Sequence, residues 1–208
     1  MKVLGIIGSF RKNGNTDILV NKVLDGIKSC GIETESIYLS DFDFKDCIGC
    51  EGCAKTNKCV IKDEMQKIYK LLEESDGIVL GSPTYFYNVT ADIKKFLDRL
   101  YCYTAFDSSD RSVWVSLNEV LKMKYGVTVA ICEQNNESDM GYTSITMDRT
   151  LQAVGYRIVD SLKVLNMFLK GEIKNYENEM KRGYCAGVKL GKTLLLSEML
   201  RNNSNISE

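Results

Sequence analysis

The chain has 208 residues, of which 44% are apolar and 26% charged, with a net charge of −1. This length and composition suit one globular domain, the near-neutral charge argues against a nucleic-acid partner, and no apolar run approaches the about 20 residues of a membrane helix. We expect a cytoplasmic protein with a single domain over residues 1–200 and a frayed tail over 201–208.

Histidine is absent from the sequence. The usual general base near neutral pH is therefore missing, which excludes Ser-His-Asp and Cys-His nucleophilic catalysis. Metal sites that depend on histidine, such as Rieske centres and His-ligated zinc, are excluded as well. Acid–base or redox work falls to other side chains or to a cofactor.

Short apolar segments alternate with amphipathic ones along the chain. The sequence predicts strands over 2–8, 34–39, 77–81, 125–132 and 156–165, and helices over 16–30, 64–75, 91–101, 142–155 and 176–200. Asp63 and Thr90 are the expected N-caps of the second and third helices. Such alternation predicts an α/β fold with a doubly wound, five-stranded parallel sheet in the flavodoxin-like order 2-1-3-4-5.

Residues 105–124 do not fit the alternation and form a long connection. One interpretation is an insertion that builds a subunit contact or covers a site. The other is a surface excursion held by one buried anchor, Trp114, the only tryptophan in the chain.

The first strand ends in "GSFRKNGNT", residues 8–16, which leads into the first helix. Hydroxyl, amide and guanidinium groups at a helix start suit a phosphate dianion, and the candidates are Ser9, Arg11, Asn15 and Thr16. The nucleoside-triphosphate loop G-x-x-x-x-G-K-[ST], the dinucleotide fingerprint G-x-G-x-x-G and the phosphatase pattern Cys-x5-Arg are all missing. A single terminal phosphate such as that of FMN fits best, and the alternative is an ordinary strand-to-helix turn.

The third strand ends in "SPTYFYN", residues 82–88, which holds the only proline and three successive aromatic residues. Ligands of this fold bind at the carboxyl ends of the strands, between the first and third, so the two loops face one binding position. Aromatic rings there can flank a flavin, while backbone groups and an amide bind its edge. The candidates are Pro83, Thr84, Tyr85, Phe86 and Asn88.

Four of the eight cysteines lie in "CIGCEGCAKTNKC", with the spacing C-x2-C-x2-C-x5-C: Cys47, Cys50, Cys53 and Cys59. A reducing compartment disfavours disulfides. Zinc sites usually combine two separate C-x2-C pairs, whereas one compact run is closer to ferredoxin spacing. Zinc, an iron–sulfur cluster and free thiols stay open on spacing alone. The remaining cysteines are assigned to packing, namely Cys30, Cys102, Cys132 and Cys185.

Together, "GSFRKNGNT", "CIGCEGCAKTNKCVIKDEM" and "SPTYFYNVTADIKKFLDR" resemble the iron–sulfur flavoproteins of the NAD(P)H-dependent FMN reductase superfamily. The resemblance covers the first half of the chain. It implies that the first loop holds the FMN phosphate, that the third-strand loop lines the flavin, and that the four cysteines hold a [4Fe–4S] cluster. It also implies a homodimer or homotetramer with electron transfer through both centres.

Three functions are therefore weighed. The first is an oxidoreductase with FMN and a cluster, which exchanges electrons between a one-electron carrier such as ferredoxin, or NAD(P)H, and a small acceptor. The second is an NAD(P)H-dependent FMN or quinone reductase without a cluster, and the third is a zinc-binding or thiol-switch module without turnover. Relatives often carry a glycine-rich loop after the fourth strand, where this chain has the acidic Glu133, Glu137 and Asp139, which disfavour the extra phosphate of NADPH. The cysteine loop follows the second strand, so we expect it on the ligand face, nearer a neighbouring subunit's flavin than its own.

Overall fold

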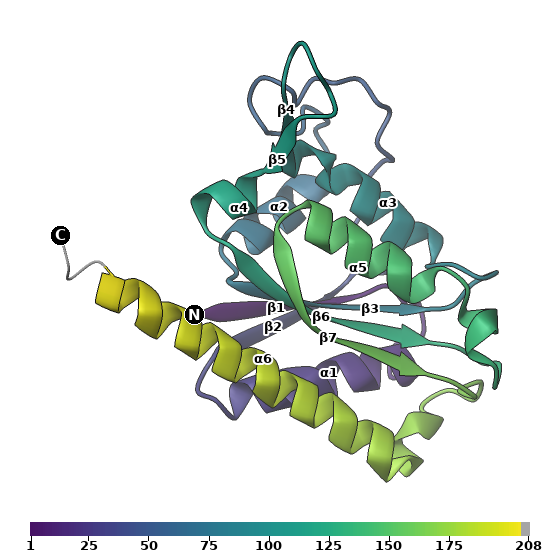
Figure 1. Ribbon diagram of the computed structural model, residues 1–208. Helices are drawn as coiled ribbons and strands as arrows, with labels where there is room; N and C mark the ends of the chain where they lie inside the picture. Colours follow the sequence, from purple (N-terminus) through teal and green to yellow (C-terminus); the bar gives the residue numbers. More distant parts are fainter. Residues whose placement is uncertain (205–208) are drawn as a thin grey trace.

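The computed structural model describes residues 1–204 and has a five-stranded parallel sheet at its centre (Figure 1). Its order is β2-β1-β3-β6-β7, with β4 and β5 in a separate pair. When only the five strands of the main sheet are numbered, this order becomes 2-1-3-4-5, as predicted. The flavodoxin-like fold is therefore confirmed. The strands are β1 (Lys2–Ile7), β2 (Glu33–Tyr38), β3 (Gly77–Pro83), β6 (Lys124–Ile131) and β7 (Tyr156–Val164).

Helices cover both faces of the sheet (Figure 1). On one face lie α1 (Asn15–Lys28) and α6 (Glu177–Ser204), and on the other lie α2 (Met65–Glu73), α3 (Ala91–Arg99) and α5 (Thr143–Ala153). Because both faces are covered, the central strands are mostly apolar, and all eight residues of β6 are buried. Each face has its own hydrophobic core.

The glycines of α6 allow this helix to approach α1 closely. A Cβ on Gly187 would lie 1.9 Å from the backbone oxygen of Val23, so no larger residue fits there without movement. The helix also continues to Ser204, beyond the predicted end at residue 200. Extending an existing helix costs little once it is nucleated, so the polar residues 201–204 remain helical. The rest of the expected frayed tail, residues 205–208, lies outside the described residues.

The predicted N-caps have different outcomes. Thr90 caps α3 as expected, since its side chain accepts a hydrogen bond from Ile93 N. The cap position of α2 is occupied by Glu64 without a side-chain bond, so the assignment of Asp63 as N-cap is wrong by one residue. The carboxylate of Asp63 still accepts from Met65 N at 3.1 Å, because it sits just outside the first turn.

The connection over 105–124 is more regular than the sequence suggested. β4 (Thr104–Phe106) pairs antiparallel with β5 (Trp114–Ser116), and a capping box at Ser116 starts α4 (Leu117–Leu121). Trp114 is 44% exposed, so its assignment as a buried anchor is wrong. It packs on Phe106 within the hairpin instead, with ring centroids 6.2 Å apart.

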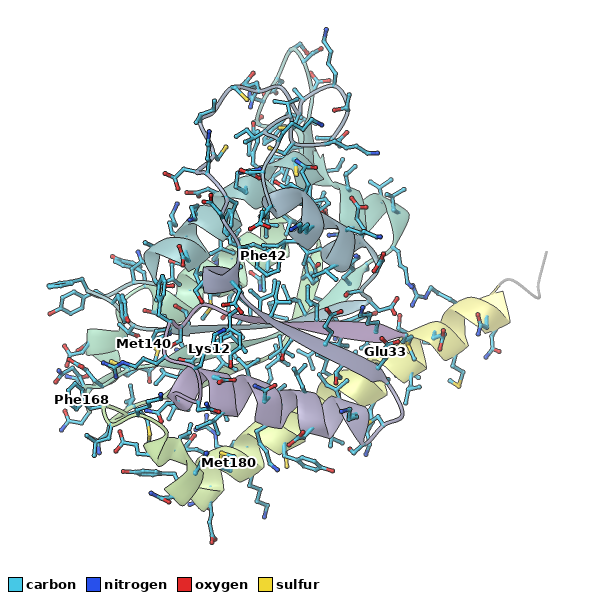
Figure 2. The ribbon with its side chains drawn as sticks, turned by 180° about the vertical axis from the view of Figure 1, so that it is seen from behind. Lys12, Glu33, Phe42, Met140, Phe168 and Met180 are labelled. Carbon is cyan, nitrogen blue, oxygen red and sulfur yellow. The ribbon has the colours of Figure 1, made fainter. Side chains whose placement is uncertain are left out.

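The carboxyl edge of the sheet brings several loops together. Figure 2 shows Lys12, Met140 and Phe168, which follow β1, β6 and β7, toward one side of the molecule, and Glu33, the first residue of β2, toward the other. Short 3-10 helices complete the described chain: η1 (Leu39–Asp41), η2 (Leu100–Tyr103), η3 (Glu137–Met140) and η4 (Glu172–Asn175). Within residues 1–204, no helix has the length and apolar character that a bilayer crossing requires.

Candidate functional site

Two cavities adjoin at the carboxyl ends of β1, β3 and β6. The larger, of about 390 Å³, is lined by Thr84, Phe86, Tyr87, Cys132, Glu133, Gln134 and Asp139. The smaller, of about 80 Å³, is lined by Ser9, Arg11, Pro83, Thr84, Tyr85, Ile131, Glu133, Met167 and Phe168. They share Thr84 and Glu133, and we call the two together the edge groove. The loops that follow β1 and β3 therefore meet at one site, as predicted.

The β1 loop is held in place by a buried carboxylate. Asp17 accepts hydrogen bonds from Asn13 N at 2.6 Å and from the Tyr38 hydroxyl at 2.5 Å. Burial, followed by the hydrogen bond to Asp17, raises the pKa of Tyr38 to about 12, so its hydroxyl remains a donor. The loop thus presents Ser9 and Arg11 to the edge groove without needing a ligand to fix its course.

Asn15 makes two side-chain hydrogen bonds to the segment after β7. Its amide nitrogen donates to Leu169 O at 2.9 Å, and its amide oxygen accepts from Ile173 N at 3.2 Å. The side chain thereby fastens the segment after β7, which carries Met167 and Phe168 into the groove. Sequence reasoning missed both residues, because this segment has no motif of its own. Like Asn15, Thr16 is buried and lines neither cavity.

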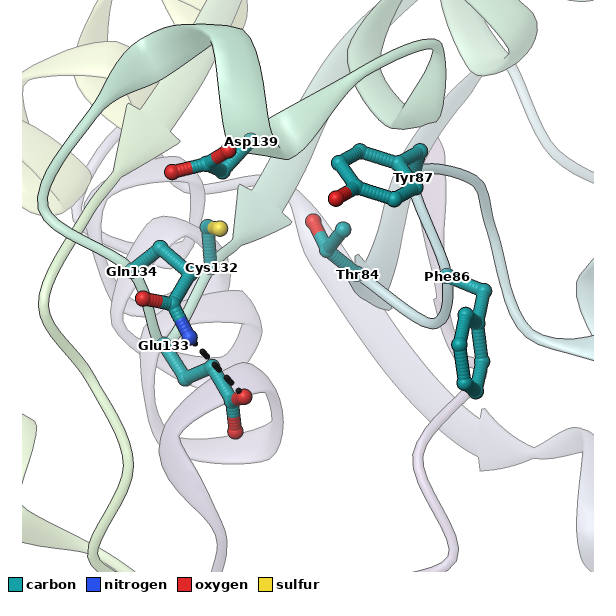
Figure 3. Close-up of a pocket in the computed structure, with 7 residues that line it drawn as sticks. All are labelled: Thr84, Phe86, Tyr87, Cys132, Glu133, Gln134 and Asp139. Atoms are coloured by element: carbon teal, nitrogen blue, oxygen red, sulfur yellow. Dashed lines mark hydrogen bonds between the residues drawn. The ribbon is translucent and has the colours of Figure 1, made fainter.

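The β3 loop makes a two-residue turn. Tyr85 and Asn88 exchange backbone hydrogen bonds of 2.8 and 3.1 Å, and both Phe86 and Tyr87 have positive φ, at 43° and 63°. These are the central positions of a type I′ turn, which ordinarily take Asn or Gly. Bulky aromatic residues there store backbone strain, and such strain is concentrated at functional sites. The Phe86 ring is 98% exposed at the rim of the groove (Figure 3).

A second loop supports this turn from behind. Gly141 has φ of +54°, and a Cβ there would lie 2.3 Å from Tyr87 O. The neighbouring Tyr142 N donates to the same oxygen at 2.7 Å. Asn88, predicted to bind the ligand edge, accepts from Val89 N and from the Thr146 hydroxyl through its amide oxygen. That oxygen therefore positions the loop.

Thr84 gives the most direct indication that the groove can bind a polar ligand. Its hydroxyl oxygen is buried and has no hydrogen-bond partner among the described residues, although it lines both parts of the edge groove. A buried hydroxyl is rarely left without a partner in a native protein. A polar ligand in the groove would satisfy it, as the carbonyl, amide and ribityl hydroxyl groups of a flavin can.

The far wall of the groove is polar and acidic. Figure 3 shows Glu133, Gln134 and Asp139 across the cavity from Thr84 and Tyr87. Glu137, the third acid noted in the sequence, turns away and pairs with Lys163 at 2.6 Å. The negative charge that faces the groove therefore comes from Glu133 and Asp139.

The four motif cysteines share a pocket of about 30 Å³, which we call the cysteine pocket. Burial, followed by repulsion from the other three thiols, raises the pKa of Cys53, which reflects how closely they are gathered. Within residues 1–204, however, no group of three or more cysteine or carboxylate side chains is placed ready to hold a metal ion. The donor set fits a thiolate-ligated group, while the side-chain positions are not those of a formed metal site.

The cysteine pocket lies apart from the edge groove. None of the four cysteines lines either cavity of the groove. The loop rests on the β4–β5 hairpin (Figure 1), with Asn57 donating to Thr104 O at 3.4 Å and Arg111 paired with Glu51 at 3.2 Å. The expectation that the cysteines lie on the ligand face is therefore wrong. Two hydrogen bonds hold the start of the loop away from that face. Lys45 N donates to the Asp63 carboxylate, and Lys45 O accepts from Arg99, the last residue of α3.

Two cysteines assigned to packing contribute to these sites. Cys132 is buried and lines the larger cavity of the edge groove, and Cys102 is buried in the wall of the cysteine pocket. Cys185 is exposed on α6, so packing does not account for it.

Comparison with known proteins gives the family. Residues 1–137 match the family model described as NADPH-dependent FMN reductase. The chain belongs to this family. The match spans every element that builds the edge groove except η3, α5 and the segment after β7.

Among curated relatives, an iron–sulfur flavoprotein of Methanocaldococcus jannaschii is 50% identical over 99 residues, which are 48% of this chain and 51% of the relative. An iron–sulfur flavoprotein of Archaeoglobus fulgidus is 34% identical over 157 residues, 74% of this chain and 64% of the relative. The chain thus spans half to two-thirds of the length of these relatives. A solved archaeal flavodoxin, at 16% identity and a TM-score of 0.60, covers 93% of this chain and 99% of its own and supports the fold. The predicted resemblance to iron–sulfur flavoproteins of the FMN reductase superfamily is confirmed.

Proposed function

We propose that this FMN reductase family member binds FMN in the edge groove and a [4Fe–4S] cluster at Cys47, Cys50, Cys53 and Cys59. The observation that carries the proposal is the coexistence of two separate sites, a groove with an unsatisfied hydroxyl and a pocket with four gathered thiols. FMN exchanges one or two electrons and a cluster exchanges one, so the pair suits transfer between a one-electron carrier and a two-electron acceptor.

In this proposal the phosphate of FMN lies at the β1 loop. Ser9 and Arg11 face the smaller cavity and supply a hydroxyl and a cation, while the start of α1 supplies backbone N–H groups. Asn15 and Thr16 fix the loop and helix behind it. The flavin ring lies in the larger cavity beside Pro83, Thr84, Tyr85 and Phe86, where the Thr84 hydroxyl gains its partner.

Four cysteinyl sulfurs are the donor set that a cubane cluster needs, and the short gaps between them let one loop surround it. Lys55 and Lys58 lie in the gap before Cys59 and moderate the negative charge of the thiolates. Because the cysteine pocket and the edge groove share no lining residue, we propose a homodimer or homotetramer in which the cluster serves a neighbouring subunit's flavin.

The electron donor is proposed as a ferredoxin-like carrier or a nicotinamide. Glu133 and Asp139 would repel the additional phosphate of NADPH, so NADH is the preferred nicotinamide in this proposal. Nothing in the proposal calls for nucleic acid or a membrane.

A second candidate is an FMN or quinone reductase whose cysteines stay free. The observation that favours it is the absence, among the described residues, of side chains placed ready for a metal. Protein purified without oxygen distinguishes the two by its visible spectrum and metal content. Flavin bands with a broad cluster shoulder and bound iron support the proposal, flavin bands alone support the second candidate, and zinc in colourless protein contradicts both.

A further inference from the structure

Arg99, the last residue of α3, is buried in the wall of the cysteine pocket. Its side chain is 0% exposed, although a helix-end arginine ordinarily reaches solvent. Sequence reasoning did not single it out. A cation held in this position, beside four thiols, needs an explanation beyond helix termination.

Two of the three guanidinium nitrogens make hydrogen bonds. Nη1 donates to Asp63 Oδ2 and to Lys45 O, both at 2.7 Å, and Nη2 donates to Asp63 Oδ1 at 3.1 Å. The third, Nε, is buried and has no hydrogen-bond partner within the described part of the chain. Leaving a donor of a buried charged group unpaired is costly, so the site is built for an acceptor that the chain does not itself supply.

The surroundings favour an anionic acceptor. Burial alone would lower the pKa of Arg99, yet that pKa is raised, chiefly by the hydrogen-bonded carboxylate of Asp63. The Tyr69 hydroxyl donates to the backbone oxygen of Arg99 at 2.7 Å, and the Cys102 thiol points to the same oxygen at 3.5 Å. The Glu51 carboxylate also lines this pocket, but it is paired with Arg111 at 3.2 Å. The other acceptors include the sulfurs of the four motif cysteines.

We propose that Arg99 donates its free Nε–H to a sulfur of the cluster and so makes the cluster easier to reduce. The inference rests on the proposed function, in which these cysteines bind a [4Fe–4S] cluster. A hydrogen bond and a buried positive charge both stabilise the more negative, reduced cluster, and such contacts tune reduction potential.

Arg111 provides a matched control. It also lies beside the cysteine loop, paired with Glu51 at 3.2 Å, but its side chain is 53% exposed. Water and salt screen its charge, so it contributes little to the cluster. Asp63 provides a second comparison, because Asp63→Asn deletes a negative charge near the pocket and keeps the Arg99 side chain.

The test is a redox titration of the cluster followed by electron paramagnetic resonance, in wild-type protein reconstituted without oxygen and in Arg99→Lys, Arg111→Lys and Asp63→Asn. Lysine keeps the charge and can reach Asp63, but it has no donor in the position of Nε. At the wild-type midpoint, the ratio of reduced to oxidised cluster is expected to fall about tenfold in Arg99→Lys, which is about 59 mV for a one-electron couple. Arg111→Lys is expected to match wild type, and Asp63→Asn is expected to shift the opposite way.

The outcomes separate the two proposals. Wild-type protein that takes up no iron overturns the proposed function and this inference with it. A wild-type cluster whose potential is unchanged in Arg99→Lys overturns the role of Arg99 alone. If Arg99→Lys does not fold, wild-type and Arg111→Lys protein carrying isotopically labelled arginine nitrogen replace it. Hyperfine coupling of that nitrogen to the reduced cluster in both supports the proposal, and its absence overturns it.

Discussion

The side-chain amide of Asn15, at the start of α1, spans to the segment after β7, where it donates to Leu169 O at 2.9 Å and accepts from Ile173 N at 3.2 Å. A residue predicted to bind phosphate thus holds one wall of the edge groove. Arg11, four residues earlier, is exposed and donates to Phe168 O of the same segment at 3.3 Å. The two residues therefore affect the site in different ways.

Asn15→Ala is expected to lower the free energy of unfolding of flavin-free protein by about 1–3 kcal/mol, because it leaves a backbone N–H and a carbonyl unpaired. Arg11→Ala is expected to leave that stability unchanged and to weaken FMN binding by about 1–3 kcal/mol, the scale of a lost hydrogen bond to a charged group. Urea unfolding and FMN fluorescence titration measure the two effects. Equal FMN affinity in Arg11→Ala and wild type would contradict the phosphate site.

Thr84→Val removes a hydroxyl that has no partner in the described structure and keeps the shape of the side chain. The flavin-free variant is expected to be as stable as wild type or slightly more so, while FMN binds about 1 kcal/mol more weakly. Thr90→Val is the contrasting control, because the Thr90 hydroxyl donates to Gly8 O at 2.8 Å and caps α3. It should destabilise the protein by about 1–2 kcal/mol. Unchanged FMN affinity in Thr84→Val would remove this contact from the account.

Gly141→Ala places a Cβ against Tyr87 O on a backbone with φ of +54°. Gly31 has a similarly positive φ of +79° but open space around it, so Gly31→Ala carries the backbone strain without the clash. We expect both variants to lose about 1 kcal/mol of stability and only Gly141→Ala to lose further stability and FMN affinity. Thermal unfolding and flavin titration of the pair test this. Identical behaviour would show that the contact with Tyr87 does not support the groove.

The apolar runs that form β1, β3 and β6 predicted the sheet and its order, because a strand covered on both faces can contain little else. The hairpin around Phe106 and Trp114 escaped prediction because its strands are three residues long and give no periodic signal. Arg99 escaped because a basic residue at a helix end is ordinarily exposed, and its burial depends on Asp63, which is distant in sequence. Thr84 was identified from its loop, whereas Phe168 entered the site through the tertiary contact of its backbone oxygen with Arg11.

Asp63 links stability to pH. Burial opposes its charge, but hydrogen bonds from Arg99, Lys45 and Met65 lower the pKa of its carboxyl below the ordinary value. A carboxylate with a lowered folded-state pKa contributes stability that is present above its unfolded pKa of about 3.9 and is lost as pH falls through the folded pKa. Urea unfolding of iron-free protein between neutral and acid pH should therefore show a decline that is weaker in Asp63→Asn. That variant should also be less stable at neutral pH by about 3–5 kcal/mol, because it leaves Arg99 buried without its partner charge. An equally steep acid decline in the variant would show that other carboxylates dominate.

The central claim is that the four motif cysteines hold an iron–sulfur cluster beside a flavin-binding domain. The most direct measurement is the Mössbauer spectrum of protein purified without oxygen from cells supplied with Mössbauer-active iron. The iron, sulfide and FMN contents of the same protein are measured alongside. Cys50→Ala tests the motif, and Cys185→Ala, an exposed cysteine on α6, is the matched control. We predict about four iron and about four sulfide per chain with a cubane signature in wild type and Cys185→Ala, and loss of that signature with FMN retained in Cys50→Ala. Wild-type protein that binds FMN but no iron, or an unchanged cluster in Cys50→Ala, would contradict the account.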